Sequence, residues 1–102
     1  MKNEPKDHAI DKNVSIPRLD LTTFFLSISS AAYMGLGLVP MGPEGRCSID
    51  LELARQNIDL LELLCEKTKG NRTPEEDRLI ENLLFETRMR FVEVSKKATQ
   101  NQ

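Results

Sequence analysis

The sequence predicts an all-α protein of three helices, in which an uncharged amphipathic helix precedes a long antiparallel helical hairpin. Three observations carry this prediction. Residues 21–40, LTTFFLSISSAAYMGLGLVP, contain no charge, although 29% of the chain is charged. Residues 50–97 place apolar residues at the spacing of an α-helix. Within that region the tetrapeptide TPEE has the form of a helix start, which divides it into two helices.

The 102 residues are enough for one domain. Residues 1–19 are predicted to be a disordered N-terminal tail, because polar residues and prolines outweigh large apolar groups there. Residues 20–97 are predicted to form a single helical domain, and residues 98–102 a frayed C-terminus. The tail has no apolar region typical of a signal peptide. The spacing between Cys47 and Cys65 matches no zinc-binding motif. These features predict a cytoplasmic protein with reduced thiols.

The first helix is predicted within the uncharged stretch. Its large apolar residues gather on one face of a helical wheel, and its hydroxyl-bearing residues crowd the other. Thr23, Ser27, Ala31 and Gly35 recur every four residues, a ridge that lets another helix approach closely. We expect one side to pack against the hairpin and the other against a second protein surface. The glycines and Pro40 are expected to end the helix.

The second helix has an apolar seam whose members are spaced by three and four residues. They are Leu51, Ala54, Ile58, Leu61 and Cys65. Three further leucines widen the seam, and charged residues fill the opposite face. Gly70 is expected to follow the end of this helix.

The third helix has the most specific start signal in the chain. Thr73 is a suitable N-cap, Pro74 fits the first helical position, and Glu76 completes a capping box. A short connection between two long helices predicts an antiparallel hairpin.

Four segments of this region resemble the family of short bacterial proteins known as domain of unknown function 1844. They are DLELARQ, IDLLELL, the turn EKTKGN with TPEE, and RMRFVE, and the family also has a similar Phe/Leu/Ser-rich segment upstream. The resemblance covers about residues 21–94. It implies a bacterial origin and a shared fold. The family has no established activity, cofactor or substrate, so the resemblance implies no function.

A single membrane span over residues 21–39 is the alternative reading of the uncharged stretch. Eight Leu, Ile, Phe or Val residues there favour insertion, but hydroxyls and glycines oppose it. A helix buried between the hairpin and another protein surface explains the stretch better, so the membrane is not the expected partner.

No arrangement typical of catalysis is present. The only histidine, His8, lies in the tail, away from the serines. Glu75 and Glu76 fit a role in the first helical turn, and the acidic residues of the second helix lack the partners of a metal site. We therefore expect no enzyme activity and no catalytic, cofactor-binding or metal-binding residues. A net charge of −2 and the lack of Trp argue against nucleic acid as a partner.

An exposed apolar stripe is predicted on the last helix. Phe85, Met89 and Val92 recur at i, i+4 and i+7, away from the main apolar face. Together with three residues of the first helix they form the candidate interface: Phe24, Ser27, Ala31, Phe85, Met89 and Val92. Alternatively, helices that cross at an angle would bury both stripes within one monomer.

Two polar residues interrupt apolar faces and are predicted to be buried. Asn57 would need a partner, either Thr87 of the same chain or, between chains, a second Asn57 or a hydroxyl of the first helix. Arg90 would extend its charge to solvent or pair with a carboxylate of the facing helix or of a second subunit. The sequence thus predicts a small cytoplasmic helical module for protein–protein interaction, self-associating or bound to an unknown protein partner, without catalysis.

Overall fold

The computed structural model describes residues 19–40 and 44–100, and these fold into three helices. Their bounds are α2 (Leu21–Gly35), α3 (Leu51–Lys67) and α4 (Pro74–Gln100). The predicted all-α, three-helix fold is confirmed. Apart from Leu19, the predicted disordered tail, with His8, lies outside the described residues.

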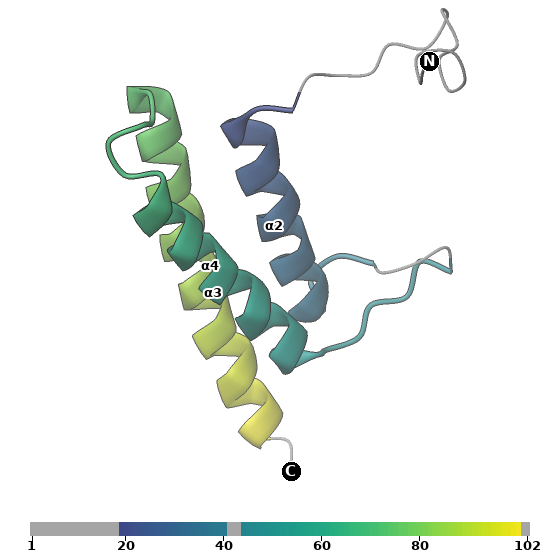
Figure 1. Ribbon diagram of the computed structural model, residues 1–102. Coiled ribbons are helices and arrows are strands. Elements are labelled where there is room, and N and C mark those ends of the chain that lie inside the picture. The colour runs from purple at the N-terminus through teal and green to yellow at the C-terminus, as the bar shows by residue number, and fades with distance from the viewer. Residues whose placement is uncertain (1–18, 41–43, 101–102) are drawn as a thin grey trace, which may run out of the picture.

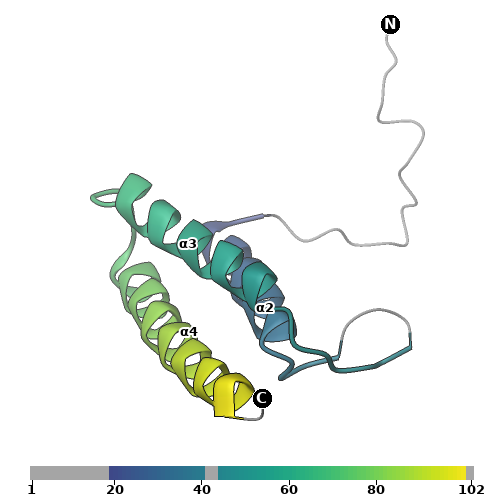
Figure 2. The same cartoon turned by 90° about the horizontal axis from the view of Figure 1, so that it is seen from below.

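The helices run down, up and down, so each is antiparallel to the next in the chain (Figure 1). Helix α2 packs more extensively against α3 than against α4. From below, the end of α2 lies beside the first turns of α3, and the end of α4 stands apart from both (Figure 2). The hairpin formed by α3 and α4 therefore supports α2 along one side.

Helix α2 begins and ends with side-chain and backbone caps. The Asp20 carboxylate accepts a hydrogen bond of 2.8 Å from the backbone N–H of Thr23, which makes Asp20 the N-cap. At the other end, Gly37 has a φ of +74°, and the Leu38 N–H donates to the Tyr33 carbonyl at 3.0 Å. This is the Schellman arrangement, in which glycine accepts the left-handed conformation, so the predicted glycine end is confirmed.

The close contact between α2 and α3 is made at Gly35. A Cβ atom added to Gly35 would lie 2.5 Å from the Ala54 backbone nitrogen and 2.9 Å from the Asp50 carbonyl oxygen. The Asp50 N–H also donates a 2.7 Å hydrogen bond to the Gly35 carbonyl. Since only a residue without Cβ fits here, Gly35 sets the distance between the two helices.

Helix α3 starts at Asp50, whose carboxylate accepts a 3.1 Å hydrogen bond from the Leu53 N–H. It ends at Lys67 with Thr68 as C-cap. Gly70 follows two residues after that cap, with a φ of +85°, in a turn closed by a 2.9 Å hydrogen bond from the Asn71 N–H to the Thr68 carbonyl. Gly70 thus lies within the turn and is not the first residue after the C-cap.

The capping box predicted for the third helix is confirmed. The Glu76 N–H donates to the Thr73 hydroxyl at 3.1 Å, and the Thr73 N–H donates to the Glu76 carboxylate at 2.8 Å. At its other end α4 continues to Gln100, beyond the predicted domain end at residue 97. No Gly or Pro interrupts residues 95–100, and the Thr99 hydroxyl donates to the Ser95 carbonyl at 3.0 Å, so the helix continues.

The core takes residues from all three helices. Its fully or almost fully buried members are Phe25, Ile28, Leu61, Ile80 and Leu84. Two hydroxyl groups are buried beside it, and each is satisfied within its own helix: Ser29 donates to the Leu26 carbonyl at 3.0 Å and Thr87 to the Leu83 carbonyl at 2.7 Å. The inward faces therefore need no polar partner from another helix at these positions.

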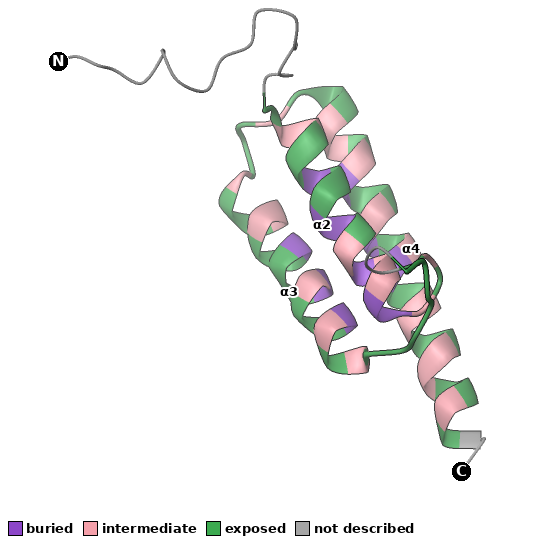
Figure 3. Cartoon of the chain, turned by 90° about the vertical axis from the view of Figure 1, so that its right-hand side faces the viewer, coloured by how far each residue is buried: buried purple, intermediate pink, exposed green. Residues whose placement is uncertain are grey.

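The second half of α4 lacks full burial. Among its described residues, none from Arg88 to Thr99 is buried, although Phe91, Val94 and Ala98 are half-buried. Figure 3 shows the lower end of α4 projecting past the other two helices in exposed and intermediate colours. Because α4 has 27 residues and α3 has 17, the hairpin partner is too short to cover it.

Candidate functional site

The apolar stripe predicted on the last helix is exposed on the outer side of α4. Phe85, Met89 and Val92, called here the α4 stripe, expose 66%, 41% and 51% of their surface. With Glu81, Leu84 and Arg88 they line a shallow, open hollow on the helix surface. The three apolar side chains are therefore accessible together, which is what contact with another protein requires.

One ion pair borders the α4 stripe and ties α4 to α3. The Arg88 guanidinium donates two hydrogen bonds, of 3.0 and 2.8 Å, to one carboxylate oxygen of Glu62. About half of each side chain is exposed, so the pair contributes little to stability. It neutralises the only charge that lies between Phe85 and Met89 on this face of the helix.

The three candidate interface residues of the first helix do not share one environment. Phe24 is 38% exposed and Ser27 is exposed, whereas Ala31 is half-buried. The Ser27 hydroxyl donates to the Thr23 carbonyl at 2.9 Å, so its hydrogen-bond capacity is partly used within α2. Phe24 and Ser27 are accessible to a second protein, and Ala31 only in part.

Asn57 is only partly buried, which corrects the expectation of a buried amide. Its side-chain nitrogen donates a 2.9 Å hydrogen bond to the Leu53 carbonyl, one turn earlier in α3. Neither Thr87 nor a second chain is needed as a partner, because a helix offers its own i−4 carbonyl to such a side chain. Asn57 lies at the rim of the hollow whose other lining residues are Gln56, Asp59, Leu60 and Leu63.

Arg90 is likewise only partly buried, and it pairs within its own helix. Its guanidinium lies 3.5 Å from the Glu86 carboxylate and 3.3 Å from that of Glu93. These are the i−4 and i+3 neighbours, which the side chain reaches without crossing to another helix. Of the alternatives left open for Arg90, extension of its charge toward solvent fits the half-exposed side chain, whereas its carboxylate partners lie on its own helix and not on the facing one. Burial raises the pKa of Tyr33 in α2. The charge of nearby Glu86 raises this pKa further, and the charge of Arg90 lowers it.

Sequence reasoning missed the most buried ion pair of the described chain, which is made by Arg72. Its side chain is only 9% exposed and its Nε donates a 2.7 Å hydrogen bond to the Asp77 carboxylate. Its Nη1 donates to the Cys65 carbonyl at 3.0 Å and to the Cys65 sulfur at 3.2 Å. The pKa of Arg72 is raised, mainly because its side chain is hydrogen-bonded to Cys65. An arginine immediately before the capping box, five residues before an aspartate, was the available signal.

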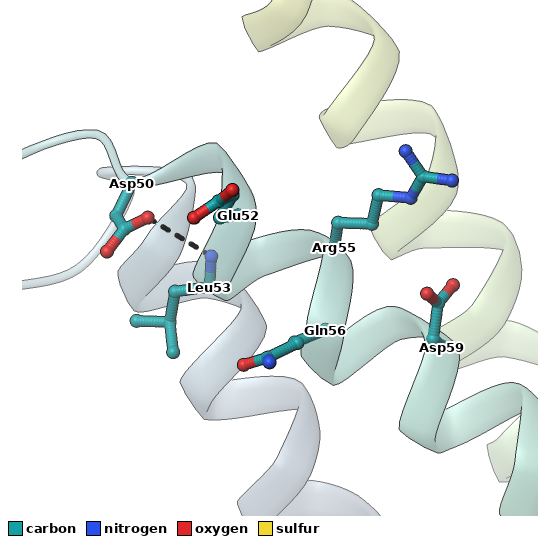
Figure 4. Close-up of a pocket in the computed structure, with 6 residues that line it drawn as sticks. All are labelled: Asp50, Glu52, Leu53, Arg55, Gln56 and Asp59. Carbon is teal, nitrogen blue, oxygen red and sulfur yellow. Dashed lines mark hydrogen bonds between the residues drawn. The ribbon is translucent and has the colours of Figure 1, made fainter.

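A further surface hollow lies along the first turns of α3 and has a mixed, mostly charged lining. Figure 4 shows the six residues: Asp50, Glu52, Leu53, Arg55, Gln56 and Asp59. The Asp50 carboxylate is already engaged as the N-cap of α3. Glu52, Arg55 and Asp59 are exposed side chains of both charges, Gln56 is exposed and neutral, and Leu53 is half-buried. The arrangement offers no paired nucleophile and base, so it suggests no chemistry.

Within residues 19–40 and 44–100, no three His, Cys, Asp or Glu side chains gather as metal ligands would. None of the helices described there is both long and apolar enough to cross a membrane. The alternative of a membrane span over residues 21–39 concerned helix α2. This helix has 15 residues and ends at Gly35.

Comparison with known protein families matches residues 18–93 to the family described as Domain of unknown function (DUF1844). No curated protein and no solved structure is significantly similar to the chain. The match covers most of the chain, including α2, α3 and all of α4 except its last turns. The resemblance seen in the hairpin segments is thus confirmed, and the chain belongs to the DUF1844 family.

Proposed function

We propose that this protein is a small helical module for protein–protein interaction, which associates with copies of itself and has no catalytic activity of its own. The observation that carries the proposal is the α4 stripe. Three large apolar side chains, among them Phe85 at 66% exposure, face solvent together on one side of one helix. Single exposed apolar residues are ordinary on protein surfaces, but a continuous stripe bordered by charges is typical of a binding surface.

The length of α4 supports the same proposal. Its second half has apolar residues on two sides, since Phe91 and Val94 are half-buried while Met89 and Val92 are exposed. A helix gains most of its stability in water from packing of its apolar face rather than from helix propensity. A second protein along the outer side of α4 would supply the packing that α3 is too short to provide.

We place the module in the cytoplasm. Cys47 and Cys65 are both free, which suits a reducing compartment. Fractionation of the native host tests this point: the protein is expected in the supernatant of a lysate made without detergent. Recovery only in a membrane or extracellular fraction would contradict it.

Native mass tests self-association directly. Light scattering and sedimentation of the full chain at about 100 μM should give at least twice the 11.6 kDa of one chain, and Phe85→Glu should shift the mass toward the monomer, because a charge in an apolar contact is costly. Leu63→Glu is the matched control, since Leu63 is 48% exposed on α3 and lines a different hollow from that of the α4 stripe. A wild-type chain that stays monomeric at every concentration overturns the proposal.

A further inference from the structure

Charges of opposite sign flank the α4 stripe at equal spacing. Glu81 lies four residues before Phe85, and Lys96 lies four residues after Val92. All four positions fall on one side of α4, since spacings of three, four and seven residues keep side chains on one face. Glu81 and Lys96 are both exposed, and neither takes part in an ion pair within the described part of the chain.

The centre of this face has no net charge. Arg88 lies between Phe85 and Met89, but its guanidinium is bound to Glu62 of α3 by two hydrogen bonds. Its aliphatic stem lines the hollow together with the α4 stripe. Arg78, seven residues before Phe85, is also exposed on this face near the start of α4. From Glu81 toward its C-terminal side, the outer face of α4 therefore reads as negative, apolar and positive.

We infer that the outer face of α4 binds α4 of a second copy of this chain, in antiparallel orientation around a twofold axis beside Arg88 and Met89. In this register Phe85 of each copy packs against Val92 of the other, and Glu81 of each copy lies opposite Lys96 of the other. The inference rests on the proposed self-association and specifies its surface, orientation and register.

Charge complementarity selects the antiparallel orientation. In a parallel pair, Glu81 would face Glu81 and Lys96 would face Lys96, and such like charges repel. In the antiparallel pair, both charged ends become opposite-charge contacts. A surface that is complementary to itself is also what a twofold symmetric dimer requires.

The antiparallel register also covers the exposed half of α4. The axis beside Arg88 and Met89 lies close to the middle of α4, which runs from Pro74 to Gln100. The two helices then overlap along almost their whole length. The first half of one α4, which is supported by its own α3, lies beside the second half of the other. Contact centred on one helix pair is small, so a dissociation constant in the micromolar range is expected.

Charge reversal tests the inference with the full chain. Glu81→Lys and Lys96→Glu should each weaken the dimer about tenfold, because each variant turns two attractive contacts into two repulsive ones. An equimolar mixture of the two variants should form a heterodimer within about threefold of wild-type affinity. In that heterodimer the introduced lysine of one copy faces the introduced glutamate of the other, and the native pair of Glu81 with Lys96 is kept at the other end. Sedimentation equilibrium gives the constants, and circular dichroism confirms that both variants keep their helices.

Each outcome decides between the inference and the proposed function. Weakened single variants with recovery in the mixture support the antiparallel register. A wild-type dimer whose affinity neither variant changes, or variants that stay weak when mixed, overturn the register but leave self-association in place. A wild-type monomer at every concentration overturns both. Glu52→Lys is the matched control, because Glu52 is exposed at the start of α3, and its effect on affinity should be less than about twofold.

Discussion

The two contacts that α3 makes with its neighbours differ in kind. With α2 it is in backbone contact, at Gly35 and Ala54, and a hydrogen bond joins the two chain segments there. With α4 the contact is made by side chains, with Leu61, Ile80 and Leu84 inside and the Glu62–Arg88 pair outside. A backbone contact tolerates no added atom, whereas a side-chain contact can repack when one residue changes.

The difference accounts for the small residues on the side of the first helix that faces α3. A helix that approaches its neighbour closely needs small residues at the contact, and α2 supplies Ala32 and Gly35, both buried. The hairpin helices lie behind larger side chains and have room for charged residues on their outer faces. Three predictions, on Gly35, Arg72 and Asp20, follow in order of decreasing expected effect.

Gly35→Ala should break the backbone contact and destabilise the protein by roughly 2–3 kcal/mol, the cost of overpacking. Helix propensity alone would give a gain of about 1 kcal/mol from the same change. Ser30→Ala is the matched control in α2, because Ser30 is exposed and the change should be within about 0.5 kcal/mol of neutral. Urea denaturation measures both. A stabilised Gly35→Ala variant would show that α2 and α3 are not in backbone contact.

Arg72→Ala should destabilise the hairpin turn by about 2 kcal/mol, because a nearly buried guanidinium with bonds to Asp77 and Cys65 is lost. Arg88→Ala removes an ion pair of the same type between half-exposed groups and should cost less than about 1 kcal/mol. The variants are compared at a concentration where the chain is monomeric. Equal losses for the two arginines would mean that burial does not distinguish them.

The smallest expected effect on stability concerns Asp20, the N-cap of α2. Hydrogen bonds from Thr23, backbone first, lower the pKa of this carboxyl below its usual 3.8. A lowered folded-state pKa means that the cap stabilises fully above the unfolded pKa and loses its contribution as pH falls through the folded value. Carbon-13 NMR titration of the carboxyl should therefore give a pKa below 3.8. Asp20→Asn keeps a capping oxygen but should remove this part of the acid sensitivity. A value at or above 3.8 would show that Asp20 does not cap α2.

The hairpin could be predicted from sequence because its signals are local. The capping box at Thr73 and Glu76 and the 3,4 spacing of the apolar seam each lie within a few residues of the element they define. The end of α2 was predictable for the same reason, since Gly37 is a typical residue for a left-handed cap. Exposure of the α4 stripe also followed from helical periodicity alone.

The polar residues of the candidate site could not be placed this way. Asn57 has several partners within reach, and the sequence does not say that the nearest one, the Leu53 carbonyl of its own helix, is the one it binds. The partner of Gly35 and the bonds of Arg72 depend on how separate segments meet in space. Spacing within one helix fixes a face, but the distance between helices is set only by the complete packing.

The hydrogen bond between the Asp50 N–H and the Gly35 carbonyl, 2.7 Å long, joins the two ends of the connection between α2 and α3. The helices on either side are thus fixed by contacts at the ends of the connection, which include the buried Leu36 and the cap made by Gly37 and Leu38. Loop length then enters the folding free energy only through closure entropy, about 0.6 kcal/mol for each doubling. This connection is consequently the place where insertions, a fused tag or a reporter domain can be accepted without changing the three-helix framework.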